Sequence, residues 1–213
     1  MTVLITGANR GVGAALLAIY RAVDGGVLGT SRGADDLLDL DVTDPASITK
    51  LATTLDGRPL QALICNSGAL HDKHWPVDGD YTAQIWSDTF AVNVTGMFMT
   101  IQALLPNLRA AQGKIAIISS QMGSNTLATG GMYAYRASKA AALNIGRNLA
   151  TDLKPEGIAV GIYHPGWVRT DMGGDDADIS AQESADGLFD RITALSLGTT
   201  GTFETWEGRP HPL

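Results

Sequence analysis

A tyrosine and a lysine four residues apart are the side chains of this sequence best suited to moving a proton. Tyr135 and Lys139 lie in the segment GMYAYRASK, and an alanine-rich run at residues 140–150 continues the expected helix. This spacing places both side chains on one face of a helix, about one turn apart. A neighbouring ammonium favours the phenolate and so lowers the tyrosine pKa from its usual value of about 10. The pair predicts a general acid and base near neutral pH, although the same spacing also occurs in surface pairs that only stabilise a helix.

The elements that would position this pair begin with a strand, a glycine turn and a helix. Residues 2–6 (TVLIT) predict a buried strand and residues 14–23 a helix, as in the first unit of a nucleotide-binding fold. Glycines let the backbone approach a pyrophosphate, and the start of the helix offers free N–H groups. The glycines do not fall at the first, third and sixth positions of the usual dinucleotide fingerprint. The turn contains Gly7, Asn9, Arg10, Gly11, Val12 and Gly13.

The second expected strand, residues 26–31, indicates which dinucleotide would bind. Its end carries no Asp or Glu of the kind that holds the ribose 2′-hydroxyl of NAD. Arg32 follows this strand and Arg10 lies in the glycine turn, so two guanidinium groups are available for a 2′-phosphate. These residues favour NADP over NAD, unless both arginines are only solvated surface charges.

Strands and helices alternate along the rest of the chain, which predicts an α/β fold with a doubly wound parallel sheet of about seven strands and helices on both faces. A crossover helix needs about a dozen residues, and only residues 33–36 separate the second strand from the third. We therefore expect the helix after strand two to be missing or reduced to a turn. The remaining strands are expected at residues 37–42, 60–66, 114–119, 156–163 and 201–206.

Polar residues stand at the carboxyl ends of these strands, where ligands bind in such sheets. Asp41 ends the third strand, residues 66–68 (Asn-Ser-Gly) end the fourth, and Ser119 and Ser120 end the fifth. Further helices are expected from Pro45, over residues 81–109 with a possible break, and over residues 181–195. Asn93 lies within the second of these helices among apolar neighbours, so it needs a hydrogen-bond partner.

The composition excludes several classes of protein. The 213 residues fit one domain, residues 1–213, and 45% apolar with 17% charged residues is ordinary for a globular protein. The net charge is −7 without a basic run, which argues against nucleic acid and anionic membranes as partners. Cys65 is the single cysteine, and His71 and His74 flank a lysine in a loop, so no metal site is expected. We find no leader and no apolar stretch of membrane-spanning length, and expect a cytoplasmic protein.

In their order along the chain, these motifs resemble those of the short-chain dehydrogenase/reductase family. The resemblance spans residues 6–170, and the segments HPGWVRTDMGG and YAYRASKAAALN further resemble the C-factor and sniffer-like carbonyl reductase subgroup. The matching positions are TGxxxGxG at residues 6–13, Asp41-Val42, Asn66-Ser67-Gly68, Asn93, Ser119-Ser120, Tyr135 with Lys139, and PGxxxT at residues 165–170.

The resemblance implies a role for each matching residue. Tyr135 would give its proton to a carbonyl oxygen, and Lys139 would lower the pKa of Tyr135 and hold the nicotinamide ribose. Ser120 would hydrogen-bond the same oxygen, and Asn93 would bind a water that links Lys139 to solvent. Toward the cofactor, the family pattern implies contacts from Gly7, Gly11 and Gly13 to the pyrophosphate, from Asp41 and Val42 to the adenine, from Asn66, Ser67 and Gly68 near the adenosine ribose, and from Pro165, Gly166, Val168 and Thr170 near the carboxamide.

Three departures from the family pattern affect these roles. Ser67 replaces the usual alanine, and the shortened region after strand two weakens the expected grip on the adenosine end. Tyr135 follows Ser120 by fifteen residues, two more than is common, so the serine role could fall to Ser119. Tyr133 has the commoner spacing but is followed four residues later by Ala137, so we retain Tyr135.

The resulting hypothesis is an NADP-dependent reductase that transfers a hydride between nicotinamide and a carbonyl or secondary alcohol, with Tyr135 as general acid and base. The alternative is a regulatory or signalling protein that senses NADP(H) without turnover, because fold alone does not fix function. The loops at residues 69–81 and 173–180 are expected to form the substrate pocket. The resemblance implies a homodimer or homotetramer, with the alanine-rich helix after Tyr135 as the candidate contact between copies.

Overall fold

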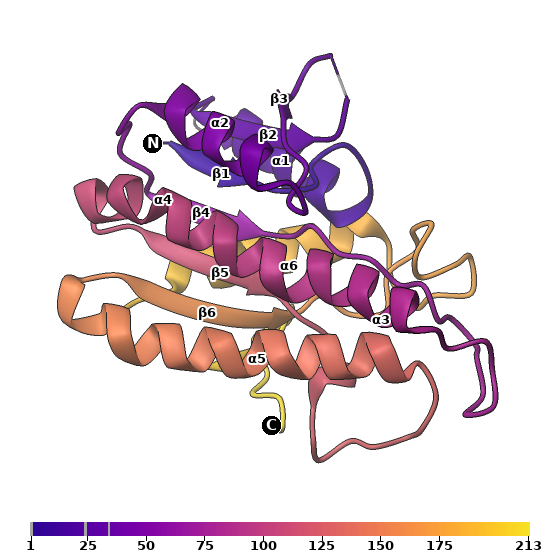
Figure 1. Cartoon of the computed structure of the whole chain (residues 1–213). Helices are drawn as coiled ribbons and strands as arrows, with labels where there is room; N and C mark the ends of the chain where they lie inside the picture. Colours follow the sequence, from indigo (N-terminus) through magenta and orange to yellow (C-terminus); the bar gives the residue numbers. More distant parts are fainter. Residues whose placement is uncertain (1, 24, 34) are drawn as a thin grey trace.

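The sheet is built from short runs of aliphatic residues, most of them buried. In the computed structural model, which describes residues 2–23, 25–33 and 35–213, seven strands pair in parallel in the order β3-β2-β1-β4-β5-β6-β7 (Figure 1). This confirms the predicted doubly wound sheet, and the carboxyl ends of its strands gather at one edge. The strands are β1 (Val3–Ile5), β2 (Val27–Ser31), β3 (Leu38–Asp39), β4 (Ala62–Cys65), β5 (Lys114–Ile118), β6 (Ala159–His164) and β7 (Phe203–Thr205).

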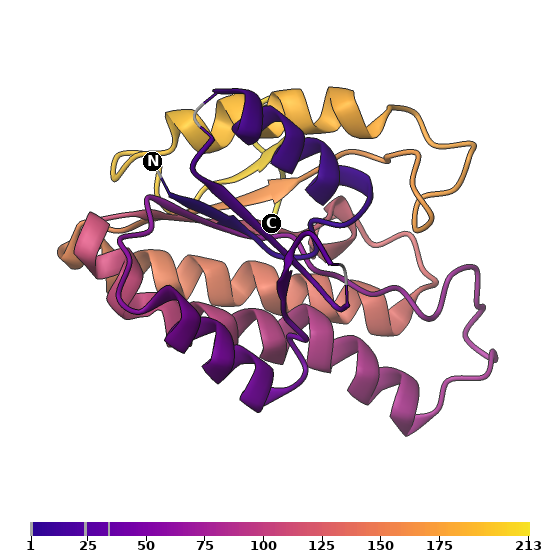
Figure 2. The same ribbon diagram turned by 90° about the horizontal axis from the view of Figure 1, so that it is seen from above.

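Helices cover both faces of the sheet, as Figure 2 shows along its edge. On one face, α1 (Gly11–Val23) and α6 (Ala181–Ala194) pack over a core that includes Leu16, Tyr163 and Leu188. On the other face, α2 (Pro45–Leu55), α4 (Met97–Ala111) and α5 (Tyr133–Leu153) pack over a larger core. Because apolar side chains leave water on both faces, the sheet is a rigid base for the loops at its carboxyl edge.

A single long helical stretch runs from residue 83 to residue 111. It consists of α3 (Ala83–Phe90), a π-helical segment η1 (Ala91–Gly96) and α4, so the expected break is a π turn within a continuous helix. By length and composition this stretch could cross a membrane, so the expectation that no apolar stretch approaches that length is wrong. Ile101, Leu104 and Leu108 of this stretch are buried in the core beside the sheet, as in the core helix of a globular protein.

Several element boundaries differ from the expected ones. β6 begins at Ala159 rather than residue 156, because Lys154–Glu156 forms a 3-10 turn (η3) that ends at Gly157 with a φ of 79°. β3 is only two residues long, so Asp41 lies beyond the strand. Among the described residues between β2 and β3 there is no helix, which confirms that prediction; Ala34 lies outside them. The helix expected from Pro45 is α2, and Asp44 caps it by accepting a 2.9 Å hydrogen bond from the N–H of Ala46.

Candidate active site

Tyr135 and Lys139 are both buried at the start of α5. Their exposed fractions are 8% and 5%, so the pair is not a surface pair that only stabilises the helix. The Lys139 Nζ lies 5.7 Å from the centroid of the Tyr135 ring and donates a 3.0 Å hydrogen bond to the carbonyl oxygen of Ile118 at the end of β5. The helix and the strand therefore together place a phenol and an ammonium at the carboxyl edge of the sheet.

The pKa of Tyr135 differs from the expectation. Burial raises the pKa of this phenol to about 12, which the hydrogen bond with Ser120 only partly offsets and which the carboxylate of Asp72 reinforces. Burial also lowers the pKa of Lys139 to about 8. The pKa of Tyr135 is therefore raised and not lowered as expected for the protein groups by themselves, because burial favours the neutral phenol and outweighs the hydrogen bond with Ser120. Tyr135 holds its proton at neutral pH.

The two neighbouring serines have different partners. The Ser119 hydroxyl donates a 3.0 Å hydrogen bond to the backbone carbonyl of Lys139, deep in the core. Ser120 hydrogen-bonds the phenol of Tyr135, and its Oγ accepts from the N–H of Met122 at 3.1 Å. Of the two serines that the sequence left open, Ser120 is the one beside the phenol.

A loop absorbs the longer spacing between Ser120 and Tyr135. After the 3-10 turn η2 (Gln121–Gly123), residues 124–132 fold back onto the first turn of α5. Arg136 holds this loop by donating to the carbonyl oxygen of Gly131 at 3.0 Å and to the hydroxyl of Thr129. Tyr133 is 38% exposed, so the tyrosine with the commoner spacing is not the buried one.

Asn93 lies in the π segment η1 and is fully engaged by the protein. Its Oδ1 accepts from the N–H of Ala69 at 2.8 Å, and its Nδ2 donates to the carbonyl oxygen of Ala69 and to the Ser138 hydroxyl, each at 2.9 Å. Both amide hydrogens are therefore used, and a hydrogen-bonded structural role describes this side chain. A side chain added at Gly68 would lie 3.5 Å from both Asn93 Oδ1 and Lys139 Nζ, so the three residues are neighbours.

The glycine turn has the shape of an anion cradle. Gly7 and Gly11 have φ values of 65° and 55°, which glycine adopts readily. A Cβ at Gly13 would lie 2.2 Å from the carbonyl oxygen of Gly7, so no other residue fits there. Asn66 holds the turn by donating 3.0 Å hydrogen bonds to the carbonyl oxygens of Thr6 and Gly7. The turn leads into the N-terminus of α1, whose free N–H groups and dipole favour a phosphate.

The two arginines expected at a 2′-phosphate are each paired with a carboxylate. Arg10 lies 2.6 Å from Asp171, and Arg32 lies 3.9 Å from Asp41, with both guanidinium groups largely exposed. Hydrogen bonds from Thr43, more than Arg32, hold the pKa of Asp41 below its usual value. The arginines are thus neither buried nor simply solvated; the partner of Arg10 is exposed and the partner of Arg32 is half-buried.

The segment after β6 lies against the glycine turn. A Cβ at Gly11 would lie 3.1 Å from the methyl group of Thr170, and the Arg10–Asp171 pair joins the same two segments. The Ser184 hydroxyl of α6 fixes Pro165 by a 2.6 Å bond to its carbonyl oxygen. Gly166 has a φ of 90°, and Val168 forms an isolated bridge with residue 179. The structure thus brings together the two segments expected to meet a dinucleotide, including Asn9 and Val12 in the turn.

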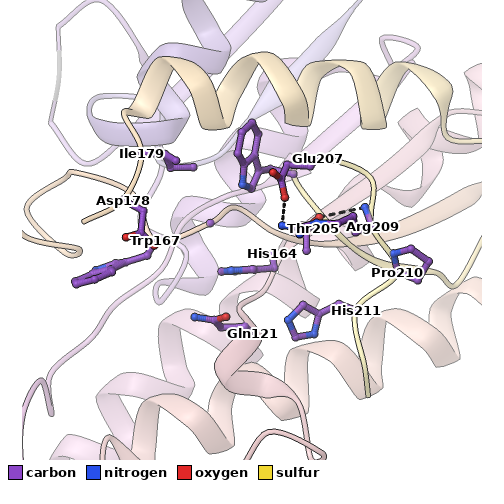
Figure 3. A pocket seen from close by; sticks show the side chains of 12 residues that line it. Gln121, His164, Trp167, Asp178, Ile179, Thr205, Glu207, Arg209, Pro210 and His211 are labelled. Carbon is purple, nitrogen blue, oxygen red and sulfur yellow. Dashed lines mark hydrogen bonds and ion pairs between the residues drawn. The ribbon is translucent and has the colours of Figure 1, made fainter. Parts of the chain in front are cut away.

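A cavity of about 490 Å³ opens at the carboxyl ends of β6 and β7 (Figure 3). Gln121, next to Ser120, and Trp167, next to Gly166, both line it. Of the two loops expected to form the substrate pocket, residues 173–180 contribute Asp178 and Ile179 to this cavity, and residues 69–81 do not line it. The remaining lining residues are His164, Gly166, Thr205, Trp206, Glu207, Arg209, Pro210 and His211.

Sequence reasoning missed the contribution of the chain after β7. His211 faces His164 in an edge arrangement with centroids 5.6 Å apart, and both rings lie beside Gln121 in Figure 3. Burial, with a smaller contribution from His211, lowers the pKa of His164 to about 4, so this imidazole is neutral at pH 7. The dipeptide His164-Pro165 could have drawn attention to this histidine, but no local pattern indicates that residues 205–211 return to it.

Comparison with known proteins agrees with this geometry. The short chain dehydrogenase family model matches residues 1–180. The C-signal protein of Myxococcus xanthus is 39% identical over 163 residues, which cover 76% of this chain and 97% of that protein.

Two solved structures are similar over the whole chain. The NADPH-bound carbonyl reductase from chicken fatty liver has a TM-score of 0.92 and 31% identity, covering 100% of this chain and 98% of that one. The carbonyl reductase Sniffer of D. melanogaster has a TM-score of 0.93 and 28% identity, covering 100% and 99%. With the family match, these similarities show that the chain belongs to the short-chain dehydrogenase/reductase family of NAD(P)-dependent oxidoreductases, in the C-factor and sniffer-like subgroup.

Proposed function

We propose that this protein is an NADP-dependent carbonyl reductase in which Tyr135 is the general acid. The observation that carries the proposal is the buried phenol of Tyr135, hydrogen-bonded to Ser120 and one helical turn from Lys139 at the carboxyl edge of the sheet. The glycine cradle at the start of α1 fits a dinucleotide, because Gly13 leaves no room for a side chain. When bound, the nicotinamide supplies the hydride.

The residues around the phenol divide the remaining work. Ser120 donates a hydrogen bond to the substrate oxygen, and Tyr135 gives that oxygen its proton as negative charge develops there. Because burial raises the pKa of Tyr135 to about 12, the phenol holds its proton at neutral pH and can give it to the substrate oxygen. Lys139 contributes positive charge beside the phenol and a donor for the nicotinamide ribose. Asn93 supports the site by fixing Ala69 and Ser138.

The cofactor is proposed to lie across the edge of the sheet from β3 to β6. Arg10 and Arg32 support NADP over NAD, since each guanidinium is exposed and Arg32 is only loosely paired with Asp41. The chicken carbonyl reductase, which has NADPH bound, gives the same preference for a similar protein. The proposed cofactor contacts are Gly7, Asn9, Arg10, Gly11, Val12, Gly13, Arg32, Asp41, Val42, Asn66, Ser67, Gly68, Tyr135, Lys139, Pro165, Gly166, Val168 and Thr170.

The substrate is proposed to enter through the cavity at the ends of β6 and β7. Its volume suits a small organic molecule. Trp167 and Trp206 give it apolar walls, while Gln121 and the neutral His164 offer hydrogen bonds. Residues 1–213 are proposed to act as one domain carrying both sites, in the cytoplasm and as a homodimer or homotetramer. Light scattering coupled to size exclusion tests the last point.

The proposal is tested by following NADPH absorbance with a panel of ketones, aldehydes and quinones. We expect turnover on at least one of them, and a loss of about 10²- to 10⁴-fold in kcat for Tyr135→Phe, the usual share of a general acid. The affinity for NADPH, measured by fluorescence titration, should stay within about twofold because the phenyl ring keeps the packing. NADPH binding without turnover on any substrate would favour a sensor, and near-normal kcat in Tyr135→Phe would refute the role of the tyrosine.

A further inference from the structure

The first turn of α5 takes its hydrogen-bond acceptor from a distant part of the chain. N–H groups at the start of a helix have no partner within that helix. Met132 occupies the N-cap position of α5 in a left-handed conformation and makes no side-chain cap hydrogen bond, and the first turn holds no acidic residue. α5 therefore lacks the local cap that Asp44 gives α2 and Ser180 gives α6.

Asp72, in the loop after β4, supplies the missing acceptor. Its Oδ2 accepts a 2.9 Å hydrogen bond from the N–H of Ala134 and a 3.4 Å hydrogen bond from the N–H of Tyr135. The residue is fully buried, and the positive end of the α5 dipole favours a negative charge at this place. Asp72 is thus bonded to the backbone of the residue that carries the phenol.

The loop that carries Asp72 is anchored on both sides of it. Asn93 holds the start of the loop through the backbone of Ala69. Further along, the rings of Trp75 and Tyr81 meet edge to face at 5.3 Å, and Tyr81 meets Tyr133 of α5 in the same way at 5.7 Å. These contacts hold the loop, and with it Asp72, in a fixed position against the start of α5.

Capping alone does not explain the choice of an aspartate. Asn or Ser would accept the same hydrogen bonds without burying a charge. The second oxygen of Asp72, Oδ1, is buried without a hydrogen-bond partner among the described residues, which is costly for a carboxylate. Because a buried carboxylate oxygen without a partner is destabilising, its presence at Asp72 points to a function for the negative charge.

We propose that Asp72 is a positioning residue for Tyr135, whose buried carboxylate replaces the N-cap of α5 and places a negative charge at the backbone of the residue that carries the phenol. This inference rests on the proposed function, in which Tyr135 is the acid. The charge of Asp72 adds to burial in raising the pKa of Tyr135, against the hydrogen bond with Ser120. The ionisable group that faces the phenol from α5 is Lys139. Removing the charge of Asp72 removes one influence that raises the pKa of the phenol, so the phenol loses its proton more easily.

The test compares Asp72→Asn, which keeps an acceptor and removes the charge, with Asp44→Asn, the same change at the cap of α2. In Asp72→Asn the decline of carbonyl reduction at high pH should move to lower pH, because a phenol of lower pKa deprotonates earlier. The ultraviolet titration of the phenolate, assigned by subtracting the Tyr135→Phe background, should move by the same amount. Asp44→Asn should leave both curves and kcat unchanged.

Each outcome separates this inference from the proposed function. A downward shift in Asp72→Asn with NADPH affinity within about twofold of wild type supports it. Unmoved curves in Asp72→Asn, or equal shifts in Asp44→Asn, overturn it even if Tyr135→Phe abolishes turnover. If Tyr135→Phe keeps normal turnover, the proposed function fails, while the phenolate titration still decides whether Asp72 acts on Tyr135. Asp72→Ala, which also removes the acceptor, should lower kcat about tenfold beyond Asp72→Asn.

Discussion

The two ends of the proposed cofactor site are built in opposite ways. At the end near β5 and α5, Tyr135, Lys139 and Ser120 are buried, and the partners of each are set by the core. At the end near β2 and β3, Arg10 and Arg32 are exposed and held only by surface carboxylates. Charges in water interact weakly and are screened by salt, whereas buried groups respond strongly to each neighbour. The proposed chemistry is thus placed where geometry is fixed, and the proposed recognition of the 2′-phosphate where it can be adjusted.

Substitution in the glycine cradle, which joins the two ends, should have the largest effect. Gly13→Ala places a Cβ 2.2 Å from the carbonyl oxygen of Gly7 and 2.5 Å from Asn66 Nδ2, so the turn must move. We expect at least about 10²-fold weaker NADPH binding and a loss of about 1–3 kcal/mol in the free energy of unfolding. Fluorescence titration and urea unfolding measure both. Gly198→Ala, where a Cβ meets nothing closer than 3.6 Å, is the matched control, and equal behaviour of the two variants would contradict the account.

The paired serines sharpen the description of the buried end. Ser120→Ala removes the hydroxyl beside the phenol and should lower kcat on the order of 10²-fold, the usual effect of losing a donor to a developing oxyanion. Ser119→Ala removes only the bond to the carbonyl oxygen of Lys139 and should cost about 1 kcal/mol of stability, with kcat within about threefold of wild type. Steady-state measurement of kcat in both variants shows which serine acts beside the phenol. A larger loss of kcat in Ser119→Ala would reverse the assignment.

His164 makes the buried end sensitive to acid. Its pKa is about 4 in the folded protein and 6.5 as a free side chain, so between these values the unfolded chain binds more protons. Stability from this residue is full above pH 6.5 and is lost as the pH falls toward 4, by about 3 kcal/mol in all. Urea unfolding from pH 7 to pH 4 should show this loss in the wild type and a smaller one in His164→Asn. Parallel curves for the two proteins would show that other groups govern acid unfolding.

The exposed end should give the smallest changes. Asp171→Asn frees Arg10 from its partner and should tighten NADPH binding by about two- to fivefold at low salt, with the gain fading as ionic strength rises. NADH, which has no 2′-phosphate, should show no such gain. Glu156→Gln, which frees Arg109 from its ion pair just before β6, away from the carboxyl edge of the sheet, is the control. An equal gain for both cofactors would place Arg10 away from the 2′-phosphate.

The sequence predicted the sheet, the glycine turn and the polar strand ends because each of these depends on local spacing. Gly13 and the Tyr135–Lys139 pair are recognised within a few residues, and burial of the β-branched runs follows from their composition. The missing helix after β2 followed from counting residues. These features need no knowledge of distant contacts.

What the sequence could not predict depends on contacts between distant residues. The pKa of Tyr135 is set by burial, which is a property of the whole core and not of the spacing to Lys139. Asp72 reaches α5 from 62 residues away, and His211 returns to His164 after the last strand. Each of these polar residues can be identified in the sequence, but its partner cannot, because no local pattern predicts the position of a loop in the fold.

The Arg136-held loop at residues 124–132 has a practical consequence. Arg136 binds the carbonyl oxygen of Gly131 and the hydroxyl of Thr129, so the connection is fastened to the helix just before it enters the core. Length can therefore be added or removed upstream of that fastening while the reactive groups keep their places. For protein engineering, the exposed Ala128, between Thr126, which binds the carbonyl oxygen of Leu213, and the residues bound by Arg136, is the natural insertion point for a label.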